Sequence, residues 1–161
     1  MIRAARPDDA GAIIGLWNPV IRDTVITFNP VEKTESDARA LIAEARARDW
    51  GFLVVEGDGR VLGFARYFQF RGGPGYARSM EHTIYLDPLS HGRGLGHALM
   101  EALESHARAR GMRMLIGGIT GSNAASLRFH AARGYAEVGR IPDAGFKFGT
   151  YHPLVLVQKR L

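Results

Sequence analysis

The chain has 161 residues, 46% of them hydrophobic, which suffices for a single domain spanning residues 1–161 with a buried core. It contains no cysteine, which excludes a disulfide scaffold, thiol catalysis and cysteine-based zinc sites. The sequence has no run of about eighteen apolar residues and no secretory signal, so we expect a cytoplasmic protein without a membrane partner. Its net charge of +5 favours polyanionic partners, but the arginines are scattered at helical spacing, which argues against nucleic acid.

The N-terminal half of the sequence predicts two helices followed by a β-hairpin. In chain order we expect a short strand at 1–5, a helix after Pro7, irregular chain at 19–34, a helix from Ser36, strands at 51–56 and 60–70, and a glycine-rich loop at 72–75. The irregular chain is predicted from Pro19 and Pro30 together with their β-branched neighbours. Gly57-Asp58-Gly59 is a hairpin turn between the two longer strands.

The C-terminal half predicts strands that alternate with helices. The expected elements are a strand at 80–86, a helix at 94–110, a strand at 114–119, a helix at 123–133, and strands at 135–141 and 153–158 around a loop at 142–149. A strand–helix–strand–helix–strand order over residues 80–141 requires a partly parallel sheet with helices packed against it. We therefore predict a mixed α/β domain.

The segment His91-Gly92-Arg93-Gly94-Leu95-Gly96 stands between a predicted strand and the longest predicted helix. Glycines at a helix N-terminus leave backbone N–H groups open to an anion, and Arg93 adds a charged contact. The same glycines also suit a tight strand-to-helix turn, and the loop alone does not separate these two interpretations. A phosphate loop of the Walker A type is excluded because Gly96 is followed by His97-Ala98.

The surroundings of this loop resemble the cofactor motif of the GCN5-related N-acetyltransferases (GNAT). The matching stretches are Tyr85-Leu86-Asp87-Pro88, His91–Gly96, Ala98-Leu99-Met100, and Asn123–His130 followed by Gly134-Tyr135. The resemblance implies a largely antiparallel central sheet, a parallel and splayed pair formed by strands 80–86 and 114–119, and helices on both faces. It also implies acetyl-CoA as the co-substrate. His91 departs from the family, which more often has Arg or Gln there.

Further stretches resemble one subgroup, the phosphinothricin and methionine sulfoximine or sulfone acetyltransferases. They are Asn18–Ile21 with Thr27-Phe28, Glu81-His82-Thr83, Ser126–His130, and Gly145–His152 with Gln158. The subgroup has histidine at position 130, where the wider family usually has a tyrosine credited with protonating the departing thiolate. Gly73 stands where the subgroup has an arginine, and Tyr151 and Pro153 replace its Trp and Asp.

Acetyl transfer needs a neutral amine beside the thioester and a path for the amine proton. We predict Glu81 as the general base, although a carboxylate at a strand end is more often simply solvated. We predict a catalytic role for His130 as general acid, general base or substrate-orienting group, and the sequence does not separate these roles. A lone helical histidine is more often a surface or core residue; the subgroup match favours function.

The resemblance assigns the remaining site residues. For the cofactor they are Ile84, Tyr85 and Leu86, whose backbone pairs with the pantetheine arm, the loop residues His91, Gly92, Arg93, Gly94, Leu95 and Gly96, and Asn123, which also suits a helix N-cap. For the acceptor they are Phe28, Arg71, Gly75 and Tyr76. No histidine and carboxylate spacing predicts a metal site, and the reaction needs no metal.

The sequence predicts an acetyl-CoA-dependent N-acetyltransferase for a small amino-acid-like acceptor. Two alternatives stay open: a GNAT enzyme for another amine, such as a protein N-terminus, an amino sugar or a polyamine, and a non-enzymatic acyl-CoA-binding regulatory domain. The basic loop 70–78 argues against a polyamine, and the presence of Glu81 and His130 argues against loss of turnover. The subgroup resemblance implies a homodimer.

Overall fold

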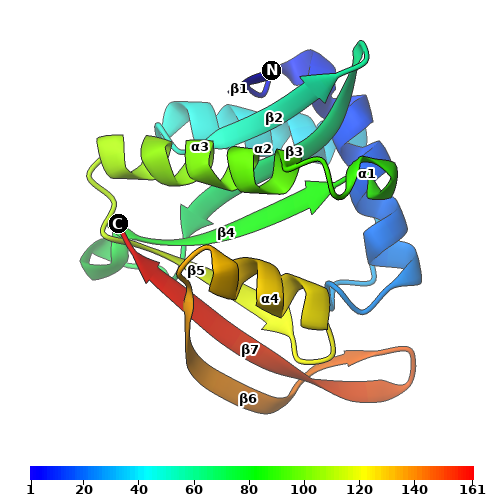
Figure 1. The fold of residues 1–161 in the computed structure, drawn as a ribbon, viewed down its shortest axis with the longest axis vertical. Helices are drawn as coiled ribbons and strands as arrows, with labels where there is room; N and C mark the ends of the chain where they lie inside the picture. The colour runs from blue at the N-terminus through cyan, green and yellow to red at the C-terminus, as the bar shows by residue number, and fades with distance from the viewer.

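A seven-stranded mixed sheet forms the centre of the protein in a computed structural model that describes residues 1–161 (Figure 1). Its strands are β1 (Ile2–Ala4), β2 (Phe52–Gly57), β3 (Arg60–Gln69), β4 (Ser79–Leu86), β5 (Met114–Thr120), β6 (Ala136–Lys147) and β7 (Thr150–Arg160). They lie in the order β1-β2-β3-β4-β5-β7-β6, and β4–β5 is the one parallel pair. The predicted mixed α/β fold with one parallel pair is confirmed.

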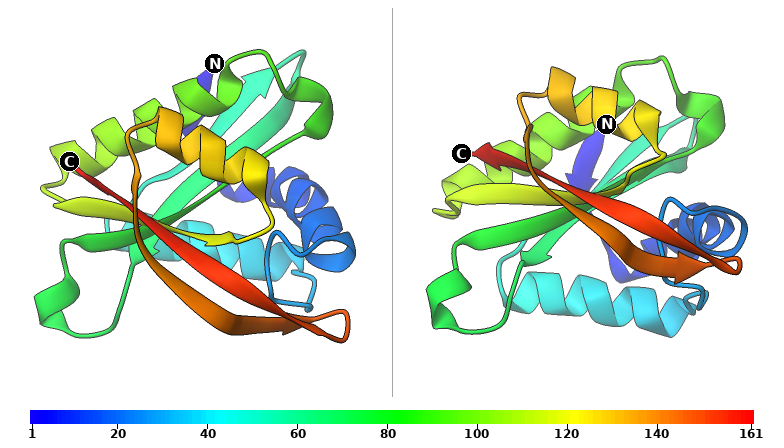
Figure 2. Two further views of the ribbon diagram at one scale, coloured as in Figure 1. Left: turned by 60° about the horizontal axis from the view of Figure 1, so that its bottom comes forward. Right: turned by 90° about the horizontal axis from the view of Figure 1, so that it is seen from below.

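Helices cover both faces of the sheet (Figure 2). They are α1 (Ala10–Asp23), α2 (Glu35–Ala47), α3 (Leu95–Ala109) and α4 (Ala124–Ala132), with 3₁₀ turns at Pro7–Asp9, Pro74–Tyr76 and Pro88–Ser90. None of the helices is both long and apolar enough to cross a membrane.

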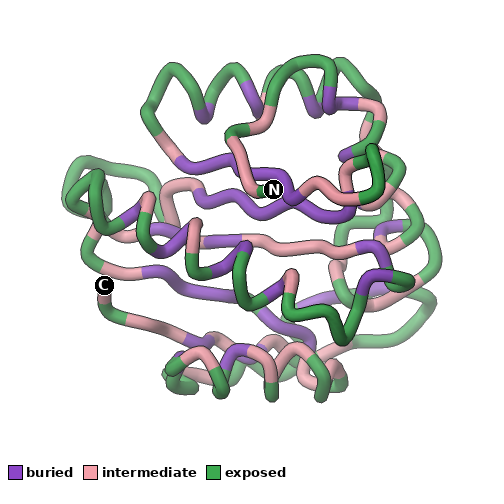
Figure 3. Tube along the Cα trace, turned by 45° about the horizontal axis from the view of Figure 1, so that its top comes forward, coloured by how far each residue is buried: buried purple, intermediate pink, exposed green.

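Side chains alternate between the two faces of the sheet along each strand, and this divides the core into two layers. In β2, Leu53 and Val55 pack with α3, whereas Phe52 and Val54 pack with α1 and α2. Strands place successive side chains on opposite faces, so each face of the sheet buries one apolar set under its own helices. Figure 3 shows the buried residues concentrated in the central strands and on the helix faces turned toward them.

The prediction of irregular chain at 19–34 is wrong for residues 19–23, because α1 continues through Pro19 to Asp23. A proline inside a helix loses one hydrogen bond and strains the preceding turn. Burial compensates here: Ile13, Trp17 and Ile21 are all buried and recur at helical spacing across the proline. Tertiary packing of one apolar face therefore decides the length of this helix.

The loop predicted at 142–149 is also wrong, since β6 runs on to Lys147 and β7 begins at Thr150. The pairing register shifts between Ile141 and Gly145, so the strand absorbs Pro142 in an irregularity at the sheet edge. The true turn is only Phe148-Gly149, both with positive φ, which is typical of a two-residue hairpin connection.

Buried Lys147 ties this hairpin to the end of α1. Its Nζ donates hydrogen bonds to the backbone carbonyls of Ile21, Thr24 (2.6 Å) and Thr27 (2.8 Å). The last carbonyls of a helix have no partners within the helix, and a cation interacts favourably with that end of its dipole. Lys147 thus ends α1 and fixes the course of the segment that follows it.

We expect Lys147→Met to lower the free energy of unfolding by about 2–4 kcal/mol, because one buried and two partly buried carbonyls lose a charged donor. Chemical denaturation measures the change. Arg108→Met is the matched control, because Arg108 is exposed on α3 and makes no ion pair, and it should change stability by less than about 0.5 kcal/mol. Equal effects of the two substitutions would contradict a structural role for Lys147.

Candidate active site

The parallel strands β4 and β5 separate soon after they meet. They pair only through Ser79, Met80 and Glu81, opposite residues 114–116. Beyond that point β4 stays paired to β3 as far as Leu86, and β5 stays paired to β7 as far as Thr120. The edge of β4 that faces β5 therefore has no strand partner beyond Glu81. A ligand with amide groups can extend the sheet there.

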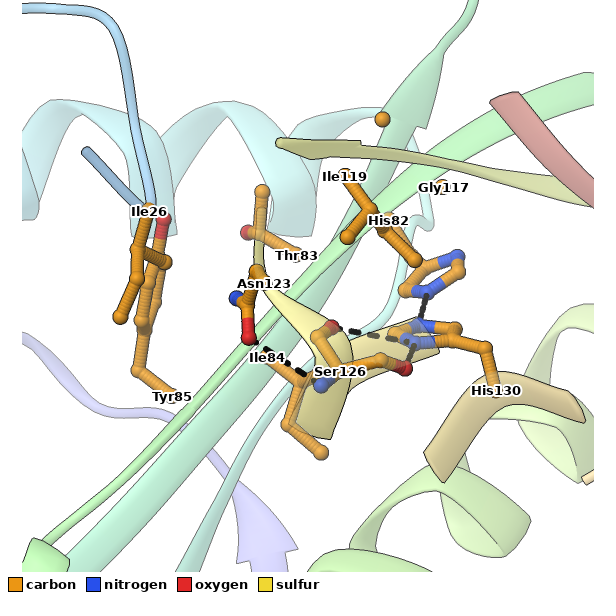
Figure 4. Close-up of a pocket in the computed structure, with 11 residues that line it drawn as sticks. Ile26, His82, Thr83, Ile84, Tyr85, Gly117, Ile119, Asn123, Ser126 and His130 are labelled. Atoms are coloured by element: carbon orange, nitrogen blue, oxygen red, sulfur yellow. Dashed lines mark hydrogen bonds between the residues drawn. The ribbon is translucent and has the colours of Figure 1, made fainter. Parts of the chain in front are cut away.

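A pocket of about 60 Å³ lies in this gap (Figure 4). Its lining comes from β4, β5, the start of α4 and the segment after α1: Ile26, His82, Thr83, Ile84, Tyr85, Gly117, Gly118, Ile119, Asn123, Ser126 and His130. Gly117 permits a close approach, because a Cβ there would lie 3.1 Å from Cε1 of His82. A glycine at this position of β5 therefore leaves room for the imidazole, whereas Gly118 faces Glu81 and Leu154.

The two faces of β4 carry different chemistry. Tyr85 packs with the α1 and α2 layer, and Ile84 packs with the α3 and α4 layer. By alternation Glu81 shares the face of Tyr85, and His82 shares the face of Ile84. Glu81 and His130 thus lie on opposite sides of the sheet. The structure does not bring these two predicted catalytic residues into direct contact.

Glu81 is half-buried and lies next to Gly118 on β5. A Cβ added to Gly118 would lie 3.5 Å from Oε1 of Glu81. Burial raises the pKa of the Glu81 carboxyl above its usual range. A carboxylate with a raised pKa is a stronger base near neutral pH. Thr83, two residues along the same face, has a buried hydroxyl with no partner in the chain, and it lines the pocket. An unsatisfied buried hydroxyl beside a pocket is available to a ligand or to water.

His130 lies inside the molecule rather than on its surface. Its Nε2 is 2.9 Å from Nε2 of His82, and its Nδ1 is 2.8 Å from the carbonyl oxygen of Ser126. Burial lowers the pKa of both imidazoles, that of His82 to about 3. Both rings are therefore neutral at physiological pH.

The start of α4 supplies the opposite wall of the pocket. Asn123 is the N-cap, and its Oδ1 accepts a hydrogen bond from the backbone N–H of Ser126 at 3.2 Å. Its side-chain N–H groups have no hydrogen-bond partner in the chain, and Asn123 lines the pocket. The helix cap and a contact with a ligand are thus compatible roles.

The loop at 91–96 forms an open anion cradle at the N-terminus of α3. None of the backbone amides of residues 92–97 donates to another backbone group. Gly94 has φ of 73°, which a residue with a Cβ adopts only under strain, and no atom lies within 4 Å of its Cβ position. The Arg93 guanidinium is exposed, 3.5 Å from Asp58. Free amides at the positive end of a helix dipole fit a pyrophosphate such as that of coenzyme A.

The other predicted cofactor residues divide between the gap and the core. Ile84 and Tyr85 line the pocket, whereas Leu86 packs into the α3 layer. Gly96 is buried in the first turn of α3, where a Cβ would lie 3.0 Å from Leu86. His91 and Leu95 flank the open cradle.

The predicted acceptor residues do not surround one pocket within the chain. Arg71, Gly75 and Tyr76 are exposed in the loop before β4, where Tyr76 packs edge-on against Phe70. Phe28 lies near the far end of β5, stacked on His152 of β7 at 6.0 Å. Figure 2 shows the two regions at different ends of the sheet.

Several pocket residues were missed by the sequence prediction. Ile26, and not Phe28, reaches the pocket from the segment after α1. His82 and Ser126 were noted only as parts of motifs. The pair Gly117-Gly118 in an apolar strand was the one local signal for a close backbone approach, whereas the contact between His82 and His130 spans 48 residues of sequence.

Comparison with known proteins agrees with this architecture. A model described as the acetyltransferase (GNAT) family matches residues 17–135. The chain therefore belongs to the GNAT family, and it is an N-acetyltransferase by fold and by relatives. This confirms the resemblance seen in the cofactor motif.

Individual relatives cover almost the whole chain. An L-methionine sulfoximine/L-methionine sulfone acetyltransferase of Salmonella typhimurium is 33% identical, over 99% of this chain and 94% of the relative. A crystal structure of a ribosomal-protein-alanine N-acetyltransferase from Brucella melitensis is 31% identical, with a TM-score of 0.96 and coverage of 100% and 99%. A phosphinothricin acetyltransferase from Sinorhizobium meliloti, solved in complex with acetyl-CoA, is 26% identical, with a TM-score of 0.94 and coverage of 100% and 88%.

We expect Gly94→Ala to weaken the binding of coenzyme A by about tenfold, because its methyl projects into the open cradle and the residue resists positive φ. Titration calorimetry with coenzyme A measures the affinity. Gly15→Ala in α1 is the matched control: Gly15 is exposed in a helix with no atom near its Cβ position. It should preserve affinity and stabilise the fold by about 0.5–1 kcal/mol. Unchanged affinity in Gly94→Ala would make the loop only a turn.

Proposed function

We propose that this protein transfers the acetyl group of acetyl-CoA to the amino group of a small amino-acid-like acceptor of the methionine sulfoximine, methionine sulfone or phosphinothricin type. The observation that carries the proposal is the half-buried Glu81 at the point where β4 and β5 separate. The names of the relatives support the acceptor class. We place the reaction in the cytoplasm, as the absence of cysteine suggests.

The residues that would hold the co-substrate lie along one continuous path. The amides of residues 92–97 and Arg93 would bind the pyrophosphate, and the free edge of β4 at Ile84 and Tyr85 would pair with the pantetheine amides. Asn123 would contact the arm from the opposite wall. Acetyl-CoA, when bound, supplies the acetyl group as an activated thioester. The free amides and the unpartnered strand edge fit such a molecule.

Glu81 takes the proton of the amine. A free aliphatic amine is mostly protonated at neutral pH, so a base that removes its proton increases the reactive fraction. Glu81 lies on the sheet face opposite the imidazoles. This arrangement lets the acceptor approach from the α1 and α2 side, while the co-substrate occupies the α3 and α4 side.

The exposed cations of loop 70–78 favour an acceptor that carries an anionic group. Arg71 and Arg78 are exposed and make no ion pair within the chain. A carboxylate or phosphinate on the acceptor would pair with such guanidinium groups. Gly73 removes one basic side chain that the subgroup has, so affinity for phosphinothricin itself should be lower than in relatives that keep it.

We propose a homodimer formed through the β6–β7 hairpin. Its exposed large apolar side chains are Val138, Ile141, Phe146, Phe148 and Tyr151. An apolar patch of this kind on a soluble domain marks an association surface. Sedimentation analysis tests the proposal, and a monomer at micromolar concentration would contradict it.

We expect thiol release from acetyl-CoA with methionine sulfone, methionine sulfoximine or phosphinothricin at least tenfold faster than with spermidine or an N-terminal alanine peptide. The basic loop prefers an acceptor with an anionic group close to its amine; a polyamine has no anionic group, and a peptide has none beside its N-terminal amine. A coupled thiol assay over this panel measures the rates. Preferential turnover of the peptide would instead place the protein with the ribosomal-protein acetyltransferases.

We expect Glu81→Gln to lower kcat/KM about 100-fold or more at pH 7, because glutamine cannot accept the amine proton. The variant should recover partly as pH rises, since the neutral amine fraction increases tenfold per pH unit below the amine's pKa. In the wild type, activity should fall on the acid side as the pH drops through the raised pKa of Glu81. Glu101→Gln, an exposed carboxylate on α3, is the control. A wild-type pH profile in Glu81→Gln would exclude Glu81 as the base.

A further inference from the structure

His82 and His130 form a buried imidazole pair beneath the pocket (Figure 4). Their side chains come from β4 and α4, and the two residues are 4% and 3% exposed. With Nε2 atoms 2.9 Å apart, one ring must donate its proton and the other must accept it. The neighbouring groups determine which ring is the donor.

The carbonyl of Ser126 fixes the tautomer of His130. A carbonyl oxygen only accepts hydrogen bonds, so the His130 Nδ1 at 2.8 Å must carry a proton. The Nε2 of the neutral ring is then a bare lone pair, and His82 Nε2–H donates to it. The neutral His82 ring then carries no proton on Nδ1, an atom that makes no hydrogen bond of normal geometry in the chain, although the backbone of Ile116 lies close enough to favour a proton on this ring.

Both nitrogens of His130 are therefore used inside the protein, and neither is free to exchange a proton with a ligand. The polar group that α4 does offer the pocket is the hydroxyl of Ser126. Its Oγ is 3.3 Å from His130 Nδ1, so it can accept a second, weaker hydrogen bond from the same N–H. The hydroxyl's own proton then remains available for a ligand.

We propose that His82 is a positioning residue whose Nε2–H keeps His130, already fixed as the Nδ1–H tautomer by the Ser126 carbonyl, in its neutral form, and that Ser126 Oγ–H, not His130, donates a hydrogen bond to the sulfur leaving the acetyl group. The proposal rests on the acetyl transfer proposed above. As the N–C bond forms and the C–S bond breaks, the bonding electron pair passes to sulfur, and the amine proton passes to Glu81. Ser126 keeps its proton, because an alcohol is a weaker acid than a thiol, and the thiolate leaves as the anion or is protonated by water.

No unpaired carboxylate faces the imidazoles to favour a charged ring. The ring of Tyr135 lies 5.2 Å from each of them. The nearest acid from α3 is Glu104, which is already bound by Arg133 at 2.8 Å and Lys159 at 2.7 Å. Desolvation therefore governs the pair, and it favours two neutral rings.

The first test reads the tautomers directly in the free protein by long-range ¹H–¹⁵N correlation spectra of the histidine rings. We expect His130 as the Nδ1–H form and His82 as the Nε2–H form, with both rings neutral at pH 7. Titration of His130 near its ordinary pKa, or an Nε2–H tautomer at neutral pH, would overturn the assignment. This readout does not depend on any acceptor or on turnover.

Substitutions of His82 test its positioning role. In His82→Leu the Nε2 of His130 loses the donor that occupies its lone pair, so we expect the ring to take a second proton more readily and its titration to move toward the ordinary histidine range. His82→Gln retains an N–H donor at a similar place and should restore the neutral ring. If the titration of His130 is unchanged in a folded His82→Leu variant, His82 is not the positioning group.

The Ser126 hydroxyl is tested by the affinity for coenzyme A as a function of pH. A donor to sulfur strengthens binding once the thiol ionises near pH 8.5, so we expect affinity to rise severalfold between pH 7 and pH 9.5. Ser126→Ala should abolish this rise while leaving His130 in the Nδ1–H tautomer, and Ser126→Thr should retain it. An equal rise in Ser126→Ala would overturn the role of the hydroxyl. Failure of the acceptor panel alone would overturn the proposed function and leave these binding and spectroscopic results standing.

Discussion

The early separation of β4 from β5 is the constraint on which the rest of the site depends. Buried backbone groups are nearly always hydrogen-bonded, yet here the edge of a central strand has no strand partner beyond Glu81. The pocket lies in that gap, between β4, β5 and the start of α4. A ligand that supplies amide groups would satisfy this edge.

Sequence patterns predicted the order of the elements because hydrophobic periodicity and turn residues are local signals. The amphipathic helix after the glycine loop and the strand at 80–86 follow this rule, and both are confirmed within one or two residues. The predictions were wrong where distant contacts outweigh local preference. Burial of Trp17 and Ile21 carries α1 through Pro19, and pairing with β7 carries β6 past Pro142.

The candidate site was less predictable from the sequence than the fold. The motif resemblance pointed to Glu81 and His130 as candidate catalytic residues, but it gave no information on the residues around them. Strand alternation alone implies that Glu81 and His82 point to opposite faces. The bond between His82 and His130 joins β4 to α4 across 48 residues, and no local pattern signals such a contact. The exposed acceptor loop and Phe28 were assigned to one pocket, and their separation became clear only in three dimensions.

The alternation of β4 also limits which changes of length this strand can absorb. Its odd residues from Glu81 face the α1 and α2 layer, and its even residues from His82 face the α3 and α4 layer. A substitution changes one of these contacts, whereas the insertion or deletion of a single residue exchanges the two sides of the strand at once. A change of length in the loop at 70–78 leaves this alternation intact, whereas a change of length within β4 does not.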